Sequence, residues 1–407
     1  MKTVGVIGGG GAGLCALRHI LDTEDMQPVV WEKAHELGGT WVYSSNIGSE
    51  RNGLSIHSSI YQNLRTNLPK NIMGFPDFHF PSEGEPFCHH SEVLKYMQDY
   101  ANKFNLLQHI KFGHHVENVS CDGEIWKVTV CELSSQVRST TACDALIICN
   151  GHYSVPRIPQ IKGLENYKGL ISHSHGYRLP CAYKDKTVVV LGAAASGIDI
   201  SKEIATVAKE VYLSHNREDS VKCGLPGNIN EVKGVTEYTD EGFVFGTESK
   251  VHADAILFCT GYEYSFPFFD SSCGVLIENN QVMPLYKQII HSKYPTMGFI
   301  GIPHDSLPFA MFHFQALYFI ATLKGQIVLP TEEEMLKTTQ EEIKTKEASG
   351  IPAKHYHNIR LDLFSYMEWL AQECKVEPLP PCFKKVWDKV ECWKGQRELN
   401  GTCCGAN

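Results

Sequence analysis

The sequence lacks the cysteine patterns that define disulfide-stapled and zinc-ribbon proteins. Its 407 residues include 15 cysteines, an odd number that cannot pair completely within one chain, and no C-x-x-C spacing occurs. The simplest zinc-ribbon and dithiol-redox interpretations are therefore excluded, and mostly reduced thiols are expected. The spacings G-x-S-x-G and H-E-x-x-H are also absent, so neither of these two motifs supplies a hydrolytic centre.

Positive charge and long apolar segments are scarce as well. Lysine and arginine number 37 against 46 acidic residues, a net charge of -9, which leaves no electrostatic footprint for nucleic acid. The segment 306–323 has 18 residues without a charged side chain, the lower limit for a membrane span. Because it contains Pro308, His313 and Gln315, we predict a buried core helix, with shallow membrane contact as the alternative. The length predicts two or three domains of about 150 residues each.

The chain opens with a β-turn-α-β pattern. A β-rich run at 3–8 is followed by a helical pattern from Ala12 to about residue 21 and a strand at 29–31. Gly8-x-Gly10-x-x-Gly13 lies between the strand and the helix, where glycines let backbone N–H groups approach a pyrophosphate. Glu32 follows 24 positions after Gly8 and can accept from a ribose 2′-hydroxyl. This segment predicts a dinucleotide site, and a ligand-free glycine turn is the alternative.

The same pattern returns after residue 186. A strand at 187–192, a helix at 196–208 and a strand at 211–213 surround Gly192-x-Ala194-x-x-Gly197. Ala194 replaces the middle glycine, and its methyl group is expected to displace the backbone or the phosphates. Arg217 follows 25 positions after Gly192, in the acid-free stretch that begins at Ser214. A guanidinium and a hydroxyl suit a 2′-phosphate, so this site predicts NADP. A solvated loop arginine is the alternative.

Two dinucleotide sites with opposite ribose preferences predict electron transfer between FAD and NADPH, because a flavin accepts hydride from nicotinamide. The strand 254–261 echoes a buried strand at 144–151, and the proline-containing stretch 152–163 connects the two repeats. The predicted fold class is α/β, with two dinucleotide-binding, Rossmann-like domains. The NADPH domain (153–265) is inserted into the FAD domain, whose first part is 1–152 and whose second part, with C-terminal helices, is 266–407.

Three further elements are expected outside the fingerprints. Residues 91–104 form an amphipathic helix with Ser91 as N-cap, and residues 124–133 alternate as an antiparallel strand. Thr331 and Glu334 form the capping box of a charged helix that extends to about residue 349.

A family signature lies between the two fingerprints. Tyr167-x-Gly169-x-x-x-His173-x-x-x-Tyr177 resembles the F-x-G-x-x-x-H-x-x-x-[YFW] signature of flavin-containing monooxygenases (class B flavoprotein monooxygenases), with tyrosine in place of the first phenylalanine. Other segments are similar to that family's second FAD contact, active-site segment and T-G-Y motif; they are 38–41, 61–70 with 73–80, and 260–262. The resemblance covers roughly residues 3–325. The compact length and the segment 64–70 most resemble short insect members, including pyrrolizidine-alkaloid (senecionine) N-oxygenases.

The resemblance implies an enzyme of oxidative detoxification of xenobiotics or alkaloids. In such an enzyme NADPH reduces FAD, O₂ adds at the flavin C4a, and the resulting hydroperoxide oxygenates a soft nucleophile. The substrate is then a tertiary amine, such as a pyrrolizidine alkaloid, or a sulfide. A Baeyer–Villiger ketone oxygenase is an alternative, although Tyr177 stands where those enzymes usually carry tryptophan. A non-catalytic, NADPH-sensing flavoprotein is the second alternative.

The resemblance and the two fingerprints together select the site residues. Asn67 matches the family's active-site asparagine and is the expected catalytic residue, with its amide as a preorganised donor. The expected FAD-binding residues are Gly8, Gly10, Gly11, Ala12, Gly13, Glu32, Lys33, Gly39, Thr40, Trp41, Thr66, Asn67, Leu68, Val116 and Gln315. The expected NADP-binding residues are Gly192, Ala194, Ala195, Ser196, Gly197, Asp199, Ser214, Arg217, Thr260, Gly261 and Tyr262. For Gln315, a core amide bonded to the backbone is an equal alternative.

The histidine pairs at 89–90, 114–115, 173–175 and 355–357 lack a convincing ligand set, so no metal is expected. The expected partners are O₂ and a small amine or sulfide, with no nucleic acid and no transmembrane segment. A soluble, cytoplasmic protein is the default expectation. Secretion from a longer precursor and assembly into a homo-oligomer are left open.

Overall fold

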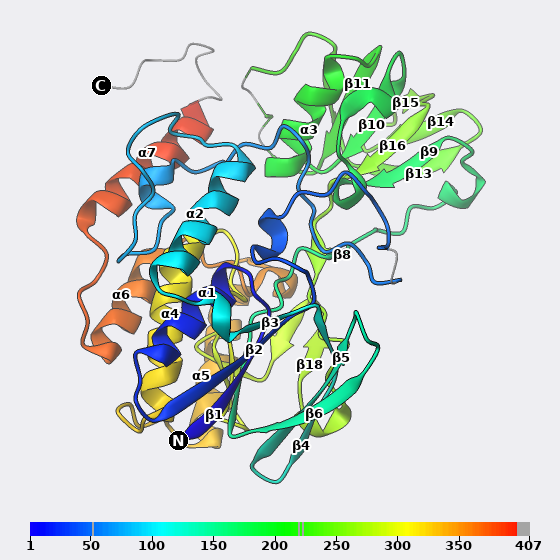
Figure 1. Cartoon of the computed structure of the whole chain (residues 1–407). Helices are drawn as coiled ribbons and strands as arrows, with labels where there is room; N and C mark the ends of the chain where they lie inside the picture. The colour runs from blue at the N-terminus through cyan, green and yellow to red at the C-terminus, as the bar shows by residue number, and fades with distance from the viewer. Residues whose placement is uncertain (51–52, 219, 222–223, 397–407) are drawn as a thin grey trace. The chain divides into compact units, whose positions relative to one another are not determined.

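The strand that opens the chain, β1 (Lys2–Ile7), lies inside a parallel sheet because its side chains are apolar on both faces. Val4 and Val6 are fully buried and Ile7 is nearly so, as expected for a strand covered on both sides. The computed structural model describes residues 1–50, 53–218, 220–221 and 224–396 (Figure 1). It comprises two units, one formed by 1–42, 68–152 and 264–383, the other by 43–67, 153–263 and the described residues from Lys384 onwards.

The first unit is built on a seven-stranded sheet with the strand order β20-β21-β22-β7-β1-β2-β3. β1 pairs in parallel with β2 and β7, and the pairings of β20 with β21 and of β21 with β22 at one edge are antiparallel. The other bounds are β2 (Met26–Glu32), β3 (Ile110–Phe112), β7 (Ala145–Ile148), β20 (Leu285–Tyr286), β21 (Ile290–His291) and β22 (Met297–Phe299).

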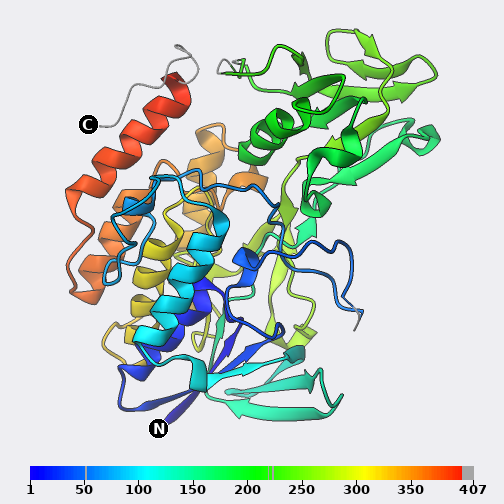
Figure 2. The ribbon, with the colours of Figure 1, turned by 45° about the horizontal axis from the view of Figure 1, so that its top comes forward.

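Helices cover one face of this sheet and a small sheet covers the other. α1 (Gly11–Leu21) packs on β1 and against α4 (Pro308–Leu323), which in turn packs against α6 (Leu363–Cys374). Figure 2 shows α2 (His90–Lys103) beside α4, where the rings of Tyr96 and Phe309 lie 5.6 Å apart. On the opposite face, Trp126 and its neighbours in the small sheet form one core with Trp31. The small sheet consists of β4 (His114–Asp122), β5 (Ile125–Glu132) and β6 (Arg138–Cys143).

The second unit repeats this architecture. Its parallel sheet has the order β12-β11-β10-β16-β9, and a three-stranded antiparallel sheet precedes β16 in the chain just as β4–β6 precede β7. α3 (Ala195–Ala205) shares a core with one face of the sheet, and Phe243 and Phe245 of the small sheet share another with the second face. The internal duplication expected from the sequence is therefore confirmed. The bounds are β9 (Leu170–His173), β10 (Thr187–Leu191), β11 (Glu210–His215), β12 (Ile229–Lys233), β13 (Val235–Thr239), β14 (Gly242–Phe245), β15 (Lys250–Val251) and β16 (Ala255–Phe258).

Most of the predicted elements outside the fingerprints are confirmed, and one cap is wrong. α2 begins one residue before Ser91, and the His89 side chain caps it by accepting from the Ser91 N–H, while the Glu92 carboxylate returns to the His89 N–H. Imidazole thus takes the capping position that sequence preference gives to serine. The capping box of Thr331 and Glu334 begins α5 (Glu332–Ala348) as predicted. The remaining strands and α-helix are β8 (Val155–Pro156), β17 (Tyr262–Glu263), β18 (Leu276–Glu278), β19 (Gln281–Met283) and α7 (Pro381–Gln396).

The uncharged segment that begins at residue 306 forms α4, a helix whose side chains are largely buried. None of the helices in the described part of the chain combines the length and the apolar character that crossing a bilayer requires.

Candidate functional site

Two glycines of the first fingerprint are required by the fold itself. Gly8 has φ +111°, and a Cβ there would lie 2.4 Å from the carbonyl oxygen of Cys149. A Cβ on Gly13 would lie 1.8 Å from the carbonyl oxygen of Gly8. These contacts let the strand β1, the turn and the helix α1 pack backbone against backbone.

Gly10 differs, because the protein itself leaves room for a side chain there. A Cβ on Gly10 would meet only backbone atoms of Gly39, at 3.6 and 3.9 Å. α1 begins at this point without a side-chain cap and with no acid in its first turn. The turn at Gly38 and Gly39 lies beside the first fingerprint, since the Gly38 N–H donates to the Gly9 carbonyl over 3.1 Å. The N–H groups at the start of α1 are uncapped, and the space beside Gly10 would be partly filled by a side chain. Both features fit the pyrophosphate of FAD.

Glu32 is held at the carboxyl end of β2 by the same turn. Its Oε2 accepts from the Gly9 N–H over 2.6 Å and its Oε1 from the Ala34 N–H over 2.7 Å, and the side chain is buried. Each carboxylate oxygen has a second lone pair, so the carboxylate can still accept from a ribose hydroxyl. Lys33 and Trp41 are half-buried beside this turn.

The second fingerprint reproduces the first. Gly192 has φ +112°, its Cβ would lie 2.4 Å from the Cys259 carbonyl oxygen, and a Cβ on Gly197 would lie 1.8 Å from the Gly192 carbonyl oxygen. Ala194 has φ −85° and ψ −173°, against −79° and −171° at Gly10. The methyl group therefore does not change the backbone conformation of the turn relative to that at Gly10. The exposed residues 194–196 begin α3 without a side-chain cap, as a phosphate-binding turn requires.

Arg217 reaches back to this turn, whereas Ser214 and Asp199 have contacts within the protein. The Arg217 Nη1 lies 3.4 Å from the Ala193 carbonyl oxygen, which brings the guanidinium beside the turn that precedes α3. Ser214 is fully buried, and its hydroxyl donates to the Lys233 carbonyl over 3.0 Å. The carboxylate of Asp199 accepts from the Tyr61 hydroxyl. The Ser214 hydroxyl proton is thus used within the protein, whereas the exposed Asp199 carboxylate keeps lone pairs for further donors.

The signature histidine fixes the T-G-Y turn. His173 Nδ1 accepts from the His175 N–H over 3.0 Å, so its Nε2 carries the proton and donates to the Gly261 carbonyl over 3.1 Å. Burial lowers the pKa of His173 to about 4, so the ring is neutral near pH 7. Gly261 has φ +83°, and the Thr260 hydroxyl donates to the Arg157 carbonyl. The signature residue therefore holds the turn that precedes Tyr262.

The rest of the signature also has structural partners. The Tyr167 hydroxyl donates to the Ala253 carbonyl over 3.0 Å, and a Cβ on Gly169 would lie 2.1 Å from that hydroxyl oxygen. The Tyr177 hydroxyl donates to Glu203 on α3 over 2.8 Å.

A buried arginine that the sequence does not single out follows the signature. Arg178 donates from all three of its nitrogens to backbone carbonyls of the second unit, and the residue is 8% exposed. The acceptors are Ser44 and Asn46 at 2.6 and 3.3 Å, Ser58 at 3.1 Å, and His175 and Tyr177 at 2.7 and 2.8 Å. Three of these five carbonyls belong to the segment 43–67, which the guanidinium therefore attaches to the signature. No sequence pattern marks this role, because a backbone carbonyl can belong to any type of residue.

Asn67 ends that segment, where the chain passes from the second unit to the first. It is exposed between the buried Thr66 and the buried Leu68. Among the described residues, none forms a hydrogen bond with its amide. Upstream, Asn63 donates to Glu203 on α3, so the approach to Asn67 is anchored on the helix of the second fingerprint.

Two other expected FAD residues lie in the core of the first unit. Gln315 is fully buried, its Oε1 accepts from the Gly301 N–H over 2.9 Å, and its Nε2 donates to the Tyr366 hydroxyl over 2.9 Å. The structure thus supports the core-amide interpretation and gives no support to a flavin contact. Val116 lies on β4 within the shared core.

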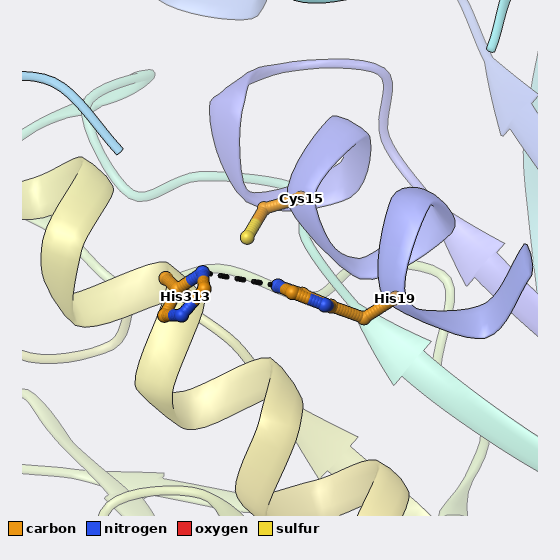
Figure 3. A group of neighbouring side chains, drawn as sticks. All are labelled: Cys15, His19 and His313. Carbon is orange, nitrogen blue, oxygen red and sulfur yellow. Dashed lines mark hydrogen bonds between the residues drawn. The ribbon is translucent and has the colours of Figure 1, made fainter. Parts of the chain in front are cut away.

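A cysteine and two histidines meet between α1 and α4 (Figure 3). Cys15, His19 and His313 place their ligand atoms within 4.8 Å of one another, and His19 Nε2 lies 3.1 Å from His313 Nδ1. Arg18, which can only donate, lies 3.1 Å from His19 Nδ1, so His19 donates through Nε2. A metal-bound imidazole instead donates from its other nitrogen. Burial lowers the pKa of both histidines, and we interpret the group as a neutral hydrogen-bonded pair.

Comparison with known proteins identifies the class. The family model described as flavin-binding monooxygenase-like matches residues 1–224 and 217–384. The chain therefore belongs to the flavin-binding monooxygenase-like family, whose members depend on FAD and NADP(H).

Individual relatives extend the likeness over nearly the whole chain. Flavin-containing monooxygenase FMO GS-OX-like 2 of Arabidopsis thaliana is 37% identical, over 97% of this chain and 87% of the relative. The structure of S-allyl-L-cysteine S-oxygenase from Allium sativum is similar with a TM-score of 0.91 and 33% identity, covering 98% of this chain and 94% of that one. Tmm from Pelagibacter sp. strain HTCC7211, at 24% identity and a TM-score of 0.86 over 97% and 91% of the two chains, shares the fold.

Proposed function

We propose that this protein is an NADPH- and O₂-dependent monooxygenase that converts small organic sulfides to sulfoxides. The observation that carries the choice of sulfur over nitrogen is the 33% identity with the S-allyl-L-cysteine S-oxygenase of Allium sativum over 98% of the chain. Bound FAD supplies the redox chemistry and O₂ activation. The protein's residues have to bind and orient the cofactors and the sulfide, and to protect the reacting centre from water.

The first fingerprint holds the FAD nucleotide in this proposal. Glu32 accepts from the ribose hydroxyls, and the N–H groups that begin α1 face the pyrophosphate. The second fingerprint holds NADPH through the N–H groups that begin α3. Arg217 binds the 2′-phosphate that distinguishes NADPH from NADH, for which a guanidinium offers paired donors.

Asn67 donates from its amide at the reacting centre. An asparagine amide that the protein leaves exposed is available to such a role, as a preorganised donor whose loss should lower oxygenation more than NADPH oxidation. Because a soft sulfur nucleophile is part of the substrate, no nucleophilic side chain of the protein is needed.

The decisive experiment supplies the FAD-loaded protein with NADPH, O₂ and one of three substrates: S-allyl-L-cysteine, a tertiary amine or a cyclic ketone. Sulfoxide formed in step with NADPH oxidation is the expected result. N-oxide without sulfoxide would replace the sulfur assignment by the amine one, and ester from the ketone would replace it by the Baeyer–Villiger one. NADPH oxidation without any oxygenated product would overturn the proposal.

Two variants test the residue roles. Arg217→Ala should raise the KM for NADPH by about tenfold to a hundredfold, the loss of one or two charge-assisted bonds, with the KM for NADH unchanged; Arg138→Ala, an exposed arginine paired with Glu117, is the control. Asn67→Ala should lower sulfoxide yield while NADPH is still consumed, and Asn102→Ala, exposed on α2, should behave as the parent protein.

A further inference from the structure

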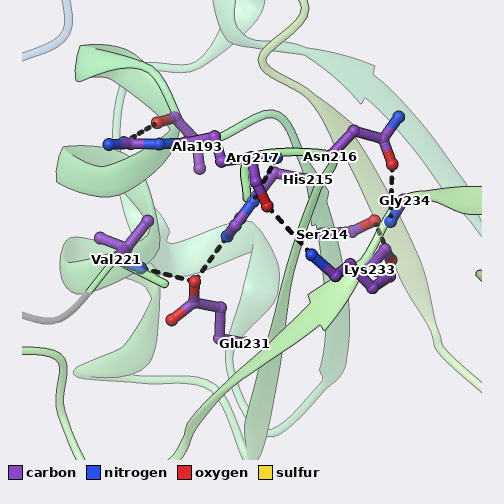
Figure 4. Close-up of polar contacts among 9 residues, drawn as sticks. All are labelled: Ala193, Ser214, His215, Asn216, Arg217, Val221, Glu231, Lys233 and Gly234. Atoms are coloured by element: carbon purple, nitrogen blue, oxygen red, sulfur yellow. Dashed lines mark hydrogen bonds and ion pairs between the residues drawn. The ribbon is translucent and has the colours of Figure 1, made fainter. Parts of the chain in front are cut away.

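The backbone of Arg217 is held on both sides by side chains that have no expected contact with the nucleotide. Figure 4 shows Arg217 just beyond β11, with its guanidinium beside Ala193 and its backbone between His215 and Lys233. Arg217 is exposed in the connection that follows β11, where an unsupported side chain would lose orientation by sampling many rotamers.

On the N–H side, His215 fixes the loop. Its Nδ1 accepts from the Arg217 N–H over 3.1 Å, which leaves the proton on Nε2, and that nitrogen lies 2.7 Å from Oε1 of Glu231. The same Oε1 accepts from the Val221 N–H over 2.5 Å. His215 is 8% exposed, so its tautomer and ring orientation are set by partners rather than by water.

On the carbonyl side, Lys233 completes the arrangement. Lys233 ends β12, and its Nζ donates to the Arg217 carbonyl over 3.0 Å. The next residue secures the neighbouring position, because the Gly234 N–H donates to Oδ1 of Asn216 over 3.2 Å. A Cβ on Gly234 would lie 2.3 Å from that oxygen, so glycine lets the two segments approach this closely.

From these contacts we propose that His215, with Glu231 behind it, and Lys233 are positioning residues for the choice of NADPH over NADH. They act by holding the Arg217 backbone so that the guanidinium stays at the phosphate side of the second fingerprint. The inference rests on the proposed role of Arg217 and adds the residues that orient its side chain. The ligand group concerned is a phosphate monoester on the adenosine 2′-oxygen.

Binding of adenine nucleotides tests the proposal without turnover. Calorimetry on the FAD-loaded protein compares adenosine 2′,5′-bisphosphate with 5′-AMP, which lacks the 2′-phosphate. Lys233→Met should weaken the bisphosphate by about threefold to tenfold, the loss of one exposed charge-assisted bond, and leave 5′-AMP unchanged. Lys233→Arg, which keeps a cationic donor, should restore most of the affinity. Lys209→Met, which removes an exposed charge from the same unit, should have no effect.

A double-mutant cycle decides whether Lys233 acts through Arg217. In an Arg217→Ala background, Lys233→Met should change bisphosphate affinity by less than about twofold. A full effect in that background means direct phosphate binding and overturns the positioning role, as does the absence of any effect in the parent protein. If Arg217→Ala itself leaves the bisphosphate and 5′-AMP equally discriminated, the proposed function of Arg217 fails first, which is a separate result.

The histidine is tested by a matched pair. Asparagine can accept from the backbone N–H two residues ahead in an Asx turn, as His215 Nδ1 does, whereas leucine cannot. His215→Leu should therefore lose bisphosphate affinity, and His215→Asn should retain more of it. Equal losses in the two variants, with circular dichroism unchanged, would overturn the role of the histidine.

Discussion

Replacing Arg178 by lysine should detach the segment 43–67. The guanidinium satisfies five carbonyls, whereas an ammonium has three donors on a single nitrogen. At least two hydrogen bonds are lost. At about 1.5–3 kcal/mol for a bond to a charged group, the segment should be destabilised by about 3–6 kcal/mol, a large part of a typical folding free energy.

Hydrogen exchange read by mass spectrometry measures this locally, which matters because a protein of several domains need not unfold in two states. The Ile56 N–H, bonded to the Gly48 carbonyl over 2.9 Å, reports opening of the segment. Arg178→Lys should speed its exchange by about a hundredfold or more. Arg157→Lys, a half-buried arginine of the same unit, is the control. If the two variants exchange alike, the guanidinium does not hold the segment.

Three further predictions follow from the turns and the buried histidine. Gly197→Ala should abolish either NADPH binding or the folding of the second unit, because its Cβ would lie 1.8 Å from a backbone oxygen. Ala194→Gly should change the free energy of unfolding by less than about 1 kcal/mol, since the backbone at Ala194 already matches that of Gly10. Similar shifts of the melting temperature for the two variants would contradict this expectation. Ala194→Gly should also leave NADPH bound at least as tightly, and calorimetric weakening would mean that the methyl group contacts the nucleotide favourably. His173, with its pKa lowered to about 4, binds a proton less readily folded than unfolded, so its contribution is complete above about pH 6.5 and is lost as pH falls from there towards 4, by at most about 1.4 kcal/mol per pH unit. Denaturant titrations from neutral pH to about pH 5 should show a shallower pH slope for His173→Gln, and identical slopes would remove the histidine from the acid sensitivity.

The elements that the sequence predicts well are those with strong local signals. The two fingerprints with their parallel strands, the buried helix near residue 315 and the capping box at Thr331 all depend on periodicity or on spacing within one segment. The predicted cap of α2 was wrong because serine and histidine side chains can both accept from a backbone N–H, and local sequence preference favours the serine. Propensity alone could not decide between adjacent candidates.

What the sequence could not supply was partners distant in the chain. Gln315 had two alternative interpretations, and its hydrogen bonds with Gly301 and Tyr366 favour the core amide. Ser214 has the residue type of a phosphate ligand, yet its hydroxyl donates to the Lys233 carbonyl of β12, the strand that lies beside β11. Lys233 and Glu231 lie on a strand whose alternation carries no functional pattern, so their relation to Arg217 required the sheet order.

The route of the chain through the second unit determines which fragments of this protein can keep the contacts of Arg178. A fragment spanning only 153–265 would carry Arg178 without Ser44, Asn46 and Ser58, three of its five acceptors. A fragment that keeps all five contacts of the guanidinium must therefore include both separate stretches, 43–67 and 153–265.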